Sequence, residues 1–95
     1  MSKFVFLAHG GMDHTPDFQE AHMKWWSSIQ DCVVDPGNPL SNGQNVTVDG
    51  AVTEITAEMD PPLGYMIVEA ASMDDALDLL TDSPMGMRVY EAIPM

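Results

Sequence analysis

The sequence predicts one α+β domain with the chain order strand, helix, strand, strand, helix, strand around a single antiparallel sheet. Apolar runs rich in β-branched and aromatic residues occur near both ends and in the second half of the chain, which is typical of strands. Two other segments repeat apolar residues every three or four positions, which is typical of amphipathic helices. The 95 residues have the length of one domain, so we assign residues 1–95 to a single unit.

The first strand and the first helix follow one another directly. Lys3 to Ala8 is an apolar run that ends at Gly10-Gly11. Thr15-Pro16 then combines a capping hydroxyl with a proline at the first helical position, which starts a helix predicted over residues 16–33. Its apolar stripe consists of Phe18, His22, Trp25, Trp26, Ile29 and Val33. Asp35-Pro36-Gly37 ends the helix, because residues before proline disfavour helical geometry.

The middle of the chain carries a hairpin signal. Asn45 to Val48 and Ala51 to Glu54 are short strand candidates, and Asp49-Gly50 between them favours a two-residue type I′ turn. Pro61 and Pro62 exclude a central strand over the next segment. Tyr65 to Ala70 resumes an apolar run and predicts the third strand.

The last third of the chain predicts a short helix and a final strand. Ser72 with Asp75 three residues later is typical of a helix start, and Ala76 to Leu80 supplies its apolar face. Pro84 and Gly86 end this helix, and Arg88 to Ile93 is the predicted last strand.

Charge and cysteine content exclude several classes of function. Asp and Glu number 15 against 3 Lys and Arg, and this excess of negative charge repels nucleic acids and anionic membrane surfaces. The apolar run Phe4 to Ala8 is too short for a signal-peptide core or a membrane span, so we expect a cytoplasmic protein. Cys32 is the only cysteine, and we expect it to be a buried structural thiol.

The predicted architecture leaves one sheet face without cover. Two helices cover one face of a four-stranded sheet, yet Lys3 to Ala8 and Tyr65 to Ala70 are apolar on both faces. A second copy of the chain can cover the other face by two-fold packing of sheet on sheet. We therefore expect a homodimer.

Three stretches of the chain resemble stretches of one known family in the same order. Val48 to Glu54 resembles a DGPF motif and its following acidic residue, with Ala and Val in place of Pro and Phe. Gly64 to Ala70 and the helix start Ser72 to Ala76 are similar to the segment after it. Phe4 to Gly11, with Asp35 to Pro39, resembles members that open with an aromatic strand ending in His-Gly-Gly. On these residues, most of the chain resembles the YCII-related family.

This resemblance implies a ferredoxin-like βαββαβ fold that pairs into a dimeric α+β barrel. Few members have an assigned activity; they include a dehydrochlorinase and enzymes for which a His and Asp pair has been suggested. That histidine lies in the helix after the first strand. The resemblance therefore assigns its role to His22.

Two histidines and an aspartate are the candidate catalytic residues. His22 lies on the apolar stripe of the first helix, which fits either a functional imidazole or a core histidine bonded to a backbone carbonyl. His9 ends the first strand on the same face as Val5 and Leu7, either lining a pocket or standing half-exposed at a strand end.

Asp35 follows the first helix and either orients one of these imidazoles or makes an ordinary turn before Pro-Gly, the reading we favour. Trp25, His9 and Asn38 are the candidate ligand-binding residues.

No motif for a cofactor is present, and we expect none. His9, Asp13, His14 and His22 are residue types that ligate zinc or iron, but their spacing matches no compact ligand motif, so we predict no metal site.

The leading hypothesis for function is a homodimeric small-molecule-binding domain with its pocket between the first helix and the sheet. Any reaction would be a proton transfer or an elimination, with His22 as general base, Asp35 or a backbone carbonyl fixing its tautomer, and His9 orienting the substrate. One alternative is a non-catalytic module that binds a ligand or a partner protein. Another is a cofactor-independent oxygenase of the related dimeric barrel type.

Overall fold

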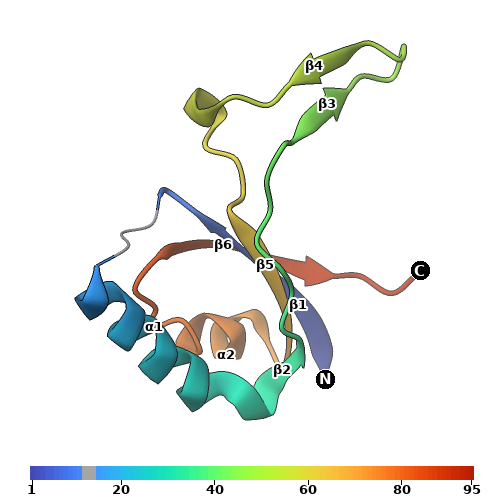
Figure 1. The fold of residues 1–95 in the computed structure, drawn as a ribbon. Helices are drawn as coiled ribbons and strands as arrows, with labels where there is room; N and C mark the ends of the chain where they lie inside the picture. The colour runs from blue at the N-terminus through green and yellow to red at the C-terminus, as the bar shows by residue number, and fades with distance from the viewer. Residues whose placement is uncertain (12–14) are drawn as a thin grey trace.

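The computed structural model describes residues 1–11 and 15–95 and shows two layers, a four-stranded antiparallel sheet and two helices packed on one of its faces (Figure 1). The strand order is β2-β5-β1-β6, formed by Val33–Asp35, Gly64–Ala70, Ser2–His9 and Gly86–Ala92. With α1 (Pro16–Ile29) and α2 (Met73–Asp78) as the two crossovers, this is the predicted ferredoxin-like α+β fold.

The central strand β1 has one covered and one uncovered face. It pairs with β5 on one side and β6 on the other. Phe4, Phe6 and Ala8 are buried beneath the helices, whereas the alternate residues Val5 and Leu7 are only partly buried. The uncovered face also carries Lys3 and His9 of the same strand and, on the neighbouring strands, Ile67, Glu69, Arg88 and Tyr90.

The first helix starts as predicted and ends earlier. The Thr15 hydroxyl accepts a hydrogen bond from Phe18 N–H at 3.1 Å, and Pro16 occupies the first helical position. The helix ends at Ile29 and a 3₁₀ turn, Gln30–Cys32, follows, so the predicted end at Val33 is wrong. Cys32 lies in this turn half-buried, not buried as expected.

The edge strand β2 replaces the last predicted turn of that helix. Val33 pairs with Val68 of β5, and Asp35 pairs with Ile67 after an irregularity in the register. β-Branched residues such as Val33 and Val34 favour an extended backbone, and the segment adopts it here as it pairs with the central strand β5.

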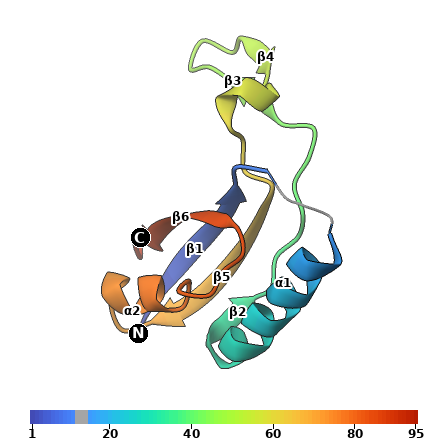
Figure 2. The same cartoon turned by 90° about the vertical axis from the view of Figure 1, so that its left-hand side faces the viewer.

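The predicted hairpin exists but lies outside the main sheet. Its strands β3 (Gln44–Val46) and β4 (Val52–Glu54) form a separate two-stranded sheet, which stands away from the helices as an arm (Figures 1 and 2). A short 3₁₀ turn, Ala57–Met59, leads back toward β5.

The connection at the tip of this hairpin is one residue longer than predicted. Thr47 N–H donates to the Ala51 carbonyl, and Gly50 N–H donates to the Thr47 carbonyl, both at 2.9 Å. The loop is therefore three residues long with Gly50 at φ +89°, and not the two-residue type I′ turn.

In the C-terminal half, the observed helix and strand agree closely with those predicted from the sequence. The Ser72 hydroxyl caps α2 by accepting from Asp75 N–H at 3.1 Å. The helix ends at Asp78, and Leu79 and Leu80 pack on the core just beyond it. The last strand begins two residues before Arg88, at Gly86, and ends at Ala92.

Candidate functional site

A cavity of about 520 Å³ lies between α1 and the helix-covered face of the sheet. This volume is within the range of small-molecule sites. Its lining is mostly apolar, and its aromatic and methionine members come from α1, the sheet and the segment before β6: Phe6, Phe18, Trp25, Trp26, Tyr65, Met23, Met66, Met85 and Met87. No Asp, Glu, Lys, Arg or Cys is among the described residues that line the cavity.

His22 brings the one imidazole to this lining. One turn of α1 separates it from Phe18, and their rings stack with centroids 6.1 Å apart and planes 18° apart. Its other neighbour is Trp25, whose ring centroid is 6.0 Å away at a tilt of 54°. The helix spacing therefore holds the imidazole between two aromatic rings, half-buried at the cavity.

The two tryptophans have different roles in the wall. Trp25 is 2% exposed and belongs to the core, where its indole N–H donates to the Leu79 carbonyl at 2.7 Å. This bond ties α1 to the end of α2. Trp26 is partly buried and packs against the core while it lines the cavity.

Asn38 also lines the cavity, and its side-chain amide donates to the Tyr65 hydroxyl at 3.3 Å. Of the ligand-binding residues predicted from the sequence, Trp25 and Asn38 therefore lie at this site.

Asp35 makes a turn. Its carboxylate accepts a hydrogen bond from Gly37 N–H at 2.9 Å, and it is not part of the cavity lining. The hydrogen bonds of the described residues include none between Asp35 and His22. The structure thus shows the turn that the sequence favours and does not bring the His and Asp pair together.

His9 lies on the other face of the sheet. It alternates with Ala8, which lines the cavity, and its ring lies against Gly86 and points toward Asp60. The ring is not among the groups that line the cavity, so His9 and His22 do not converge on one site. Both histidines belong to the described part of the chain, whereas Asp13 and His14 of the metal hypothesis lie outside it.

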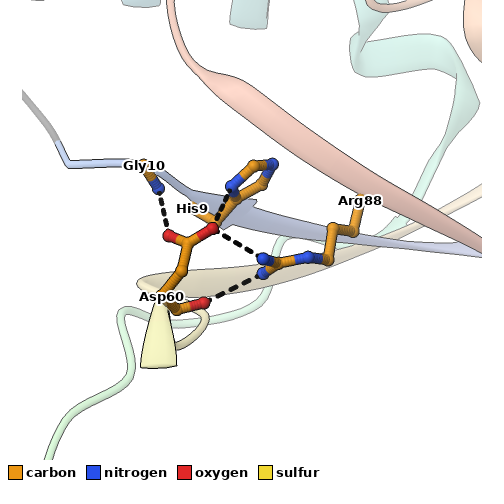
Figure 3. A network of polar contacts seen from close by, with 4 residues as sticks. All are labelled: His9, Gly10, Asp60 and Arg88. Atoms are coloured by element: carbon orange, nitrogen blue, oxygen red, sulfur yellow. Dashed lines mark hydrogen bonds and ion pairs between the residues drawn. The ribbon is translucent and has the colours of Figure 1, made fainter. Parts of the chain in front are cut away.

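A carboxylate network surrounds His9 on this uncovered face (Figure 3). Asp60 Oδ2 accepts from His9 Nδ1 at 2.9 Å and from Arg88 Nη2 at 2.6 Å, while Oδ1 accepts from Gly10 N–H at 3.0 Å. Arg88 Nη1 also donates to the Asp60 carbonyl at 3.1 Å. Asp60 adopts a left-handed conformation, φ +50°, which Asp tolerates better than most residues.

This network sets the pKa of Asp60. Desolvation works to raise that pKa, but the hydrogen bond from Gly10 N–H, the bond and charge of His9 and the charge of Arg88 together outweigh it, and the pKa is lowered. A carboxyl whose pKa is lower in the folded than in the unfolded chain stabilises the fold above its unfolded pKa. That stabilisation is lost as pH falls through the folded pKa.

We predict a specific acid response for Asp60→Asn. The variant keeps an acceptor for Gly10 N–H and loses the charge, so its free energy of unfolding should be lower than that of the wild type near neutral pH. The difference should shrink below about pH 4, where Asp60 of the unfolded chain begins to take up its proton, and should shrink further as pH falls through the lowered pKa of the folded state. Urea denaturation at pH 7, 5 and 3 checks this. Glu58→Gln, an exposed change on the same segment, is the control; an Asp60→Asn difference that stays constant to pH 3 contradicts the assignment.

Sequence reasoning missed part of both sites. Gln19 and Met23 flank the apolar stripe of α1 and line the cavity. A prediction that allowed a wider stripe would have included both residues. Asp60 and Arg88 are 28 residues apart in sequence, and no local pattern pairs them.

Among the described residues, no three or more His, Cys, Asp or Glu gather as metal ligands do, and no helix is long and apolar enough to cross a membrane.

Comparison with known proteins gives one informative match. No protein-family model matches the chain, and no curated protein matches it. Among solved structures, the chain is similar to 5-chloro-2-hydroxyhydroquinone dehydrochlorinase from Burkholderia phenoliruptrix, solved in complex with 2,5-dihydroxybenzoquinone. The two share 17% sequence identity with a TM-score of 0.50, over 93% of this chain and 90% of the other. The match shows that the chain has the fold of that enzyme.

Proposed function

We propose that the protein binds a small, flat, largely apolar molecule in the cavity between α1 and the sheet. The observation that carries this is the lining, in which aromatic rings and methionines surround the space and His22 supplies the one imidazole. Aromatic rings favour planar ligands by stacking, and methionine adapts to irregular shapes. The absence of charged side chains from the described lining favours a neutral or weakly acidic ligand, such as a phenol or a quinone.

His22 is the residue that we propose to orient this ligand. A half-buried imidazole within an apolar lining offers a hydrogen bond to a hydroxyl or a carbonyl group where few other partners compete. Gln19 is a second polar group at the same wall. We therefore assign recognition of the ligand's polar substituent to His22.

The assembly that we propose is a homodimer formed through the uncovered sheet faces, as in the dimeric α+β barrels that the sequence resembles. The apolar side chains on that face support it, because Val5, Leu7 and Ile67 remain partly exposed in one subunit and Tyr90 is 56% exposed. Membership in the YCII-related family is part of the same proposal. It rests on the motif resemblance and on the fold shared with the dehydrochlorinase.

Ligand binding is tested with 2,5-dihydroxybenzoquinone, the molecule that the similar enzyme holds, and with planar phenols of its size. We expect at least one of them to bind the wild type by isothermal titration calorimetry and to raise its melting temperature by about 10 °C at 100 times Kd. His22→Phe keeps an aromatic ring and removes both nitrogens, so its affinity should fall about 3-fold to 10-fold, the loss of one hydrogen bond.

His9→Gln, on the other face of the sheet, is the matched control and should bind as the wild type does. Absence of binding by the whole set of planar molecules, or equal losses in the two histidine variants, would contradict the proposal.

A second candidate is catalysis of proton transfer or elimination by His22. It is favoured by the imidazole at the cavity and by the fold of an enzyme that removes chloride. The described residues supply no carboxylate partner for His22, so the binding function ranks first. Release of chloride from 5-chloro-2-hydroxyhydroquinone by the wild type and not by His22→Phe would reverse this order.

A further inference from the structure

The floor of the cavity is a row on the sheet that contains two very small residues. Ala8 of β1 pairs with Gly64 of β5 on one side and with Met87 of β6 on the other, and all three residues line the cavity. The next row along β1 is filled, because Phe6 lies opposite Met66 and both side chains are buried. The cavity therefore lies where Ala8 and Gly64 leave the space that large side chains fill one row further along the sheet.

The wall that faces this floor is aromatic. Phe18, His22 and Trp26 belong to α1, which packs over the same face of the sheet, and all three line the cavity. The floor crosses three neighbouring strands spaced ~4.8 Å apart, so it is about 10 Å wide. A space between a sheet and a wall of rings suits a flat molecule, because the faces of aromatic rings stack in offset or tilted arrangements.

The volume of the cavity is larger than one aromatic ring needs. An apolar cavity of about 150 Å³ holds one benzene molecule. The cavity beneath α1 measures about 520 Å³, which is more than three times as much. Met23 lines the cavity and is 69% exposed, so it marks the side that opens to solvent, and part of the volume belongs to that mouth. The remainder has room for two or three fused rings.

The free polar side chains of the described lining lie on one wall. Gln19 and His22 are three positions apart on α1, so their side chains are neighbours on the helix surface. Asn38 and Tyr65 are bonded to each other through the Asn38 amide and the Tyr65 hydroxyl. The side chains of the floor offer only hydrocarbon and thioether surface. A ligand that matches this lining has its polar group at one end, beside α1, and is apolar elsewhere.

We propose that the ligand is a fused aromatic molecule of two or three rings that carries a hydroxyl or carbonyl group at one end. This inference rests on the binding function proposed above and assigns the size and shape of the ligand. The rings lie between α1 and the floor formed at Ala8 and Gly64, and the polar group meets His22. The one-ring quinone held by the similar dehydrochlorinase would fill only part of this cavity.

Isothermal titration calorimetry of the wild type with phenol, 1-naphthol and 9-phenanthrol tests the size of the ligand. We expect Kd to fall about 10-fold or more from phenol to 1-naphthol, because the second ring withdraws more apolar surface from water. 9-Phenanthrol should also bind more tightly than phenol. The control for shape is 4-butylphenol, which has as many carbon atoms as 1-naphthol but carries some of them in a flexible chain. It should bind about threefold or more weakly than 1-naphthol, because the chain loses conformational freedom on binding.

Ala8→Val tests where the rings lie. The substitution adds two methyl groups to the floor of the cavity, and valine is well suited to a strand. It should raise the Kd of 9-phenanthrol about 10-fold or more and that of phenol less than about threefold, because only the larger ligand needs the whole floor. Val5→Ile, on the uncovered face of the same strand, is the control and should change neither Kd. Circular dichroism checks that both variants keep the fold.

The outcomes separate the fused-ring ligand from the binding function itself. If phenol binds as tightly as the fused probes, or 4-butylphenol binds as tightly as 1-naphthol, the fused-ring ligand is overturned and the binding function stands. If Ala8→Val weakens phenol and 9-phenanthrol equally, the rings do not lie over Ala8. Absence of binding by these probes and by 2,5-dihydroxybenzoquinone overturns the binding function, and this inference with it.

Discussion

Gly37→Ala should destabilise the fold strongly. Gly37 has φ +73°, and a Cβ atom at this position would lie 1.6 Å from the Tyr65 carbonyl oxygen of β5. That atom is backbone of a central strand, so the chain around Asp35 has to separate from β5 to relieve the clash. We expect a loss above about 4 kcal/mol, against a total stability of roughly 5 to 14 kcal/mol for a domain of this length.

The measurement for Gly37→Ala is the melting temperature with Gly50→Ala as its control. Gly50 has φ +89°, but nothing lies within 4 Å of its missing Cβ. Gly50→Ala therefore introduces the same backbone strain of about 1 to 2 kcal/mol as Gly37→Ala but no steric clash. We expect Gly37→Ala to be insoluble or to melt at least 15 °C below Gly50→Ala. Similar melting temperatures for the two variants would show that the close approach of Gly37 to β5 is wrong.

Trp25→Ala is the second substitution with a large expected effect. The side chain is among the largest fully buried ones, packs with Phe4 and Phe6, and joins α1 to the end of α2 through Leu79. Truncation of a buried tryptophan typically lowers the free energy of unfolding by about 3 to 5 kcal/mol, because the apolar surface of the side chain is no longer buried and a cavity remains in its place. The Leu79 carbonyl also loses its indole partner.

Denaturation by urea measures this loss, with Trp26→Ala as the adjacent control. Trp26 is partly buried, so its truncation should cost less than half as much as that of Trp25. Trp25→Phe should fall between the wild type and Trp25→Ala, because it restores apolar volume without the hydrogen bond to Leu79. Equal losses at Trp25 and Trp26 would contradict the assignment of Trp25 to the core.

The sequence predicted the helix starts and the long strands because their signals are local. Thr15-Pro16 and Ser72 are capping residues that act on backbone amides within three positions, and both do so in the structure. The short edge strand β2 escaped prediction because three residues carry little periodicity. Val33 is extended because it meets Val68, which is a tertiary contact.

Only those residues of the candidate site that have a local signal in the sequence were predicted. Helical spacing placed His22 and Trp25 on the face toward the sheet, and both line the cavity. His9 was placed correctly beside Val5 and Leu7, but β1 is apolar on both faces, and no local signal tells which face the helices cover. The carboxylate network around His9 depends on Asp60 and Arg88, which come from distant segments, and the location of the hairpin arm depends on which strands enter the main sheet.

The central claim is that the cavity between α1 and the sheet is the binding site. NMR of the protein with 2,5-dihydroxybenzoquinone, or with the planar phenol that binds most tightly, tests it directly, because the two tryptophans give two indole N–H signals and each histidine gives its own ring signals. We predict that saturating ligand moves the Trp26 indole and the His22 ring signals and leaves the His9 ring unchanged. Shifts at His9 with none at Trp26 or His22 would place the ligand on the uncovered sheet face and contradict the account.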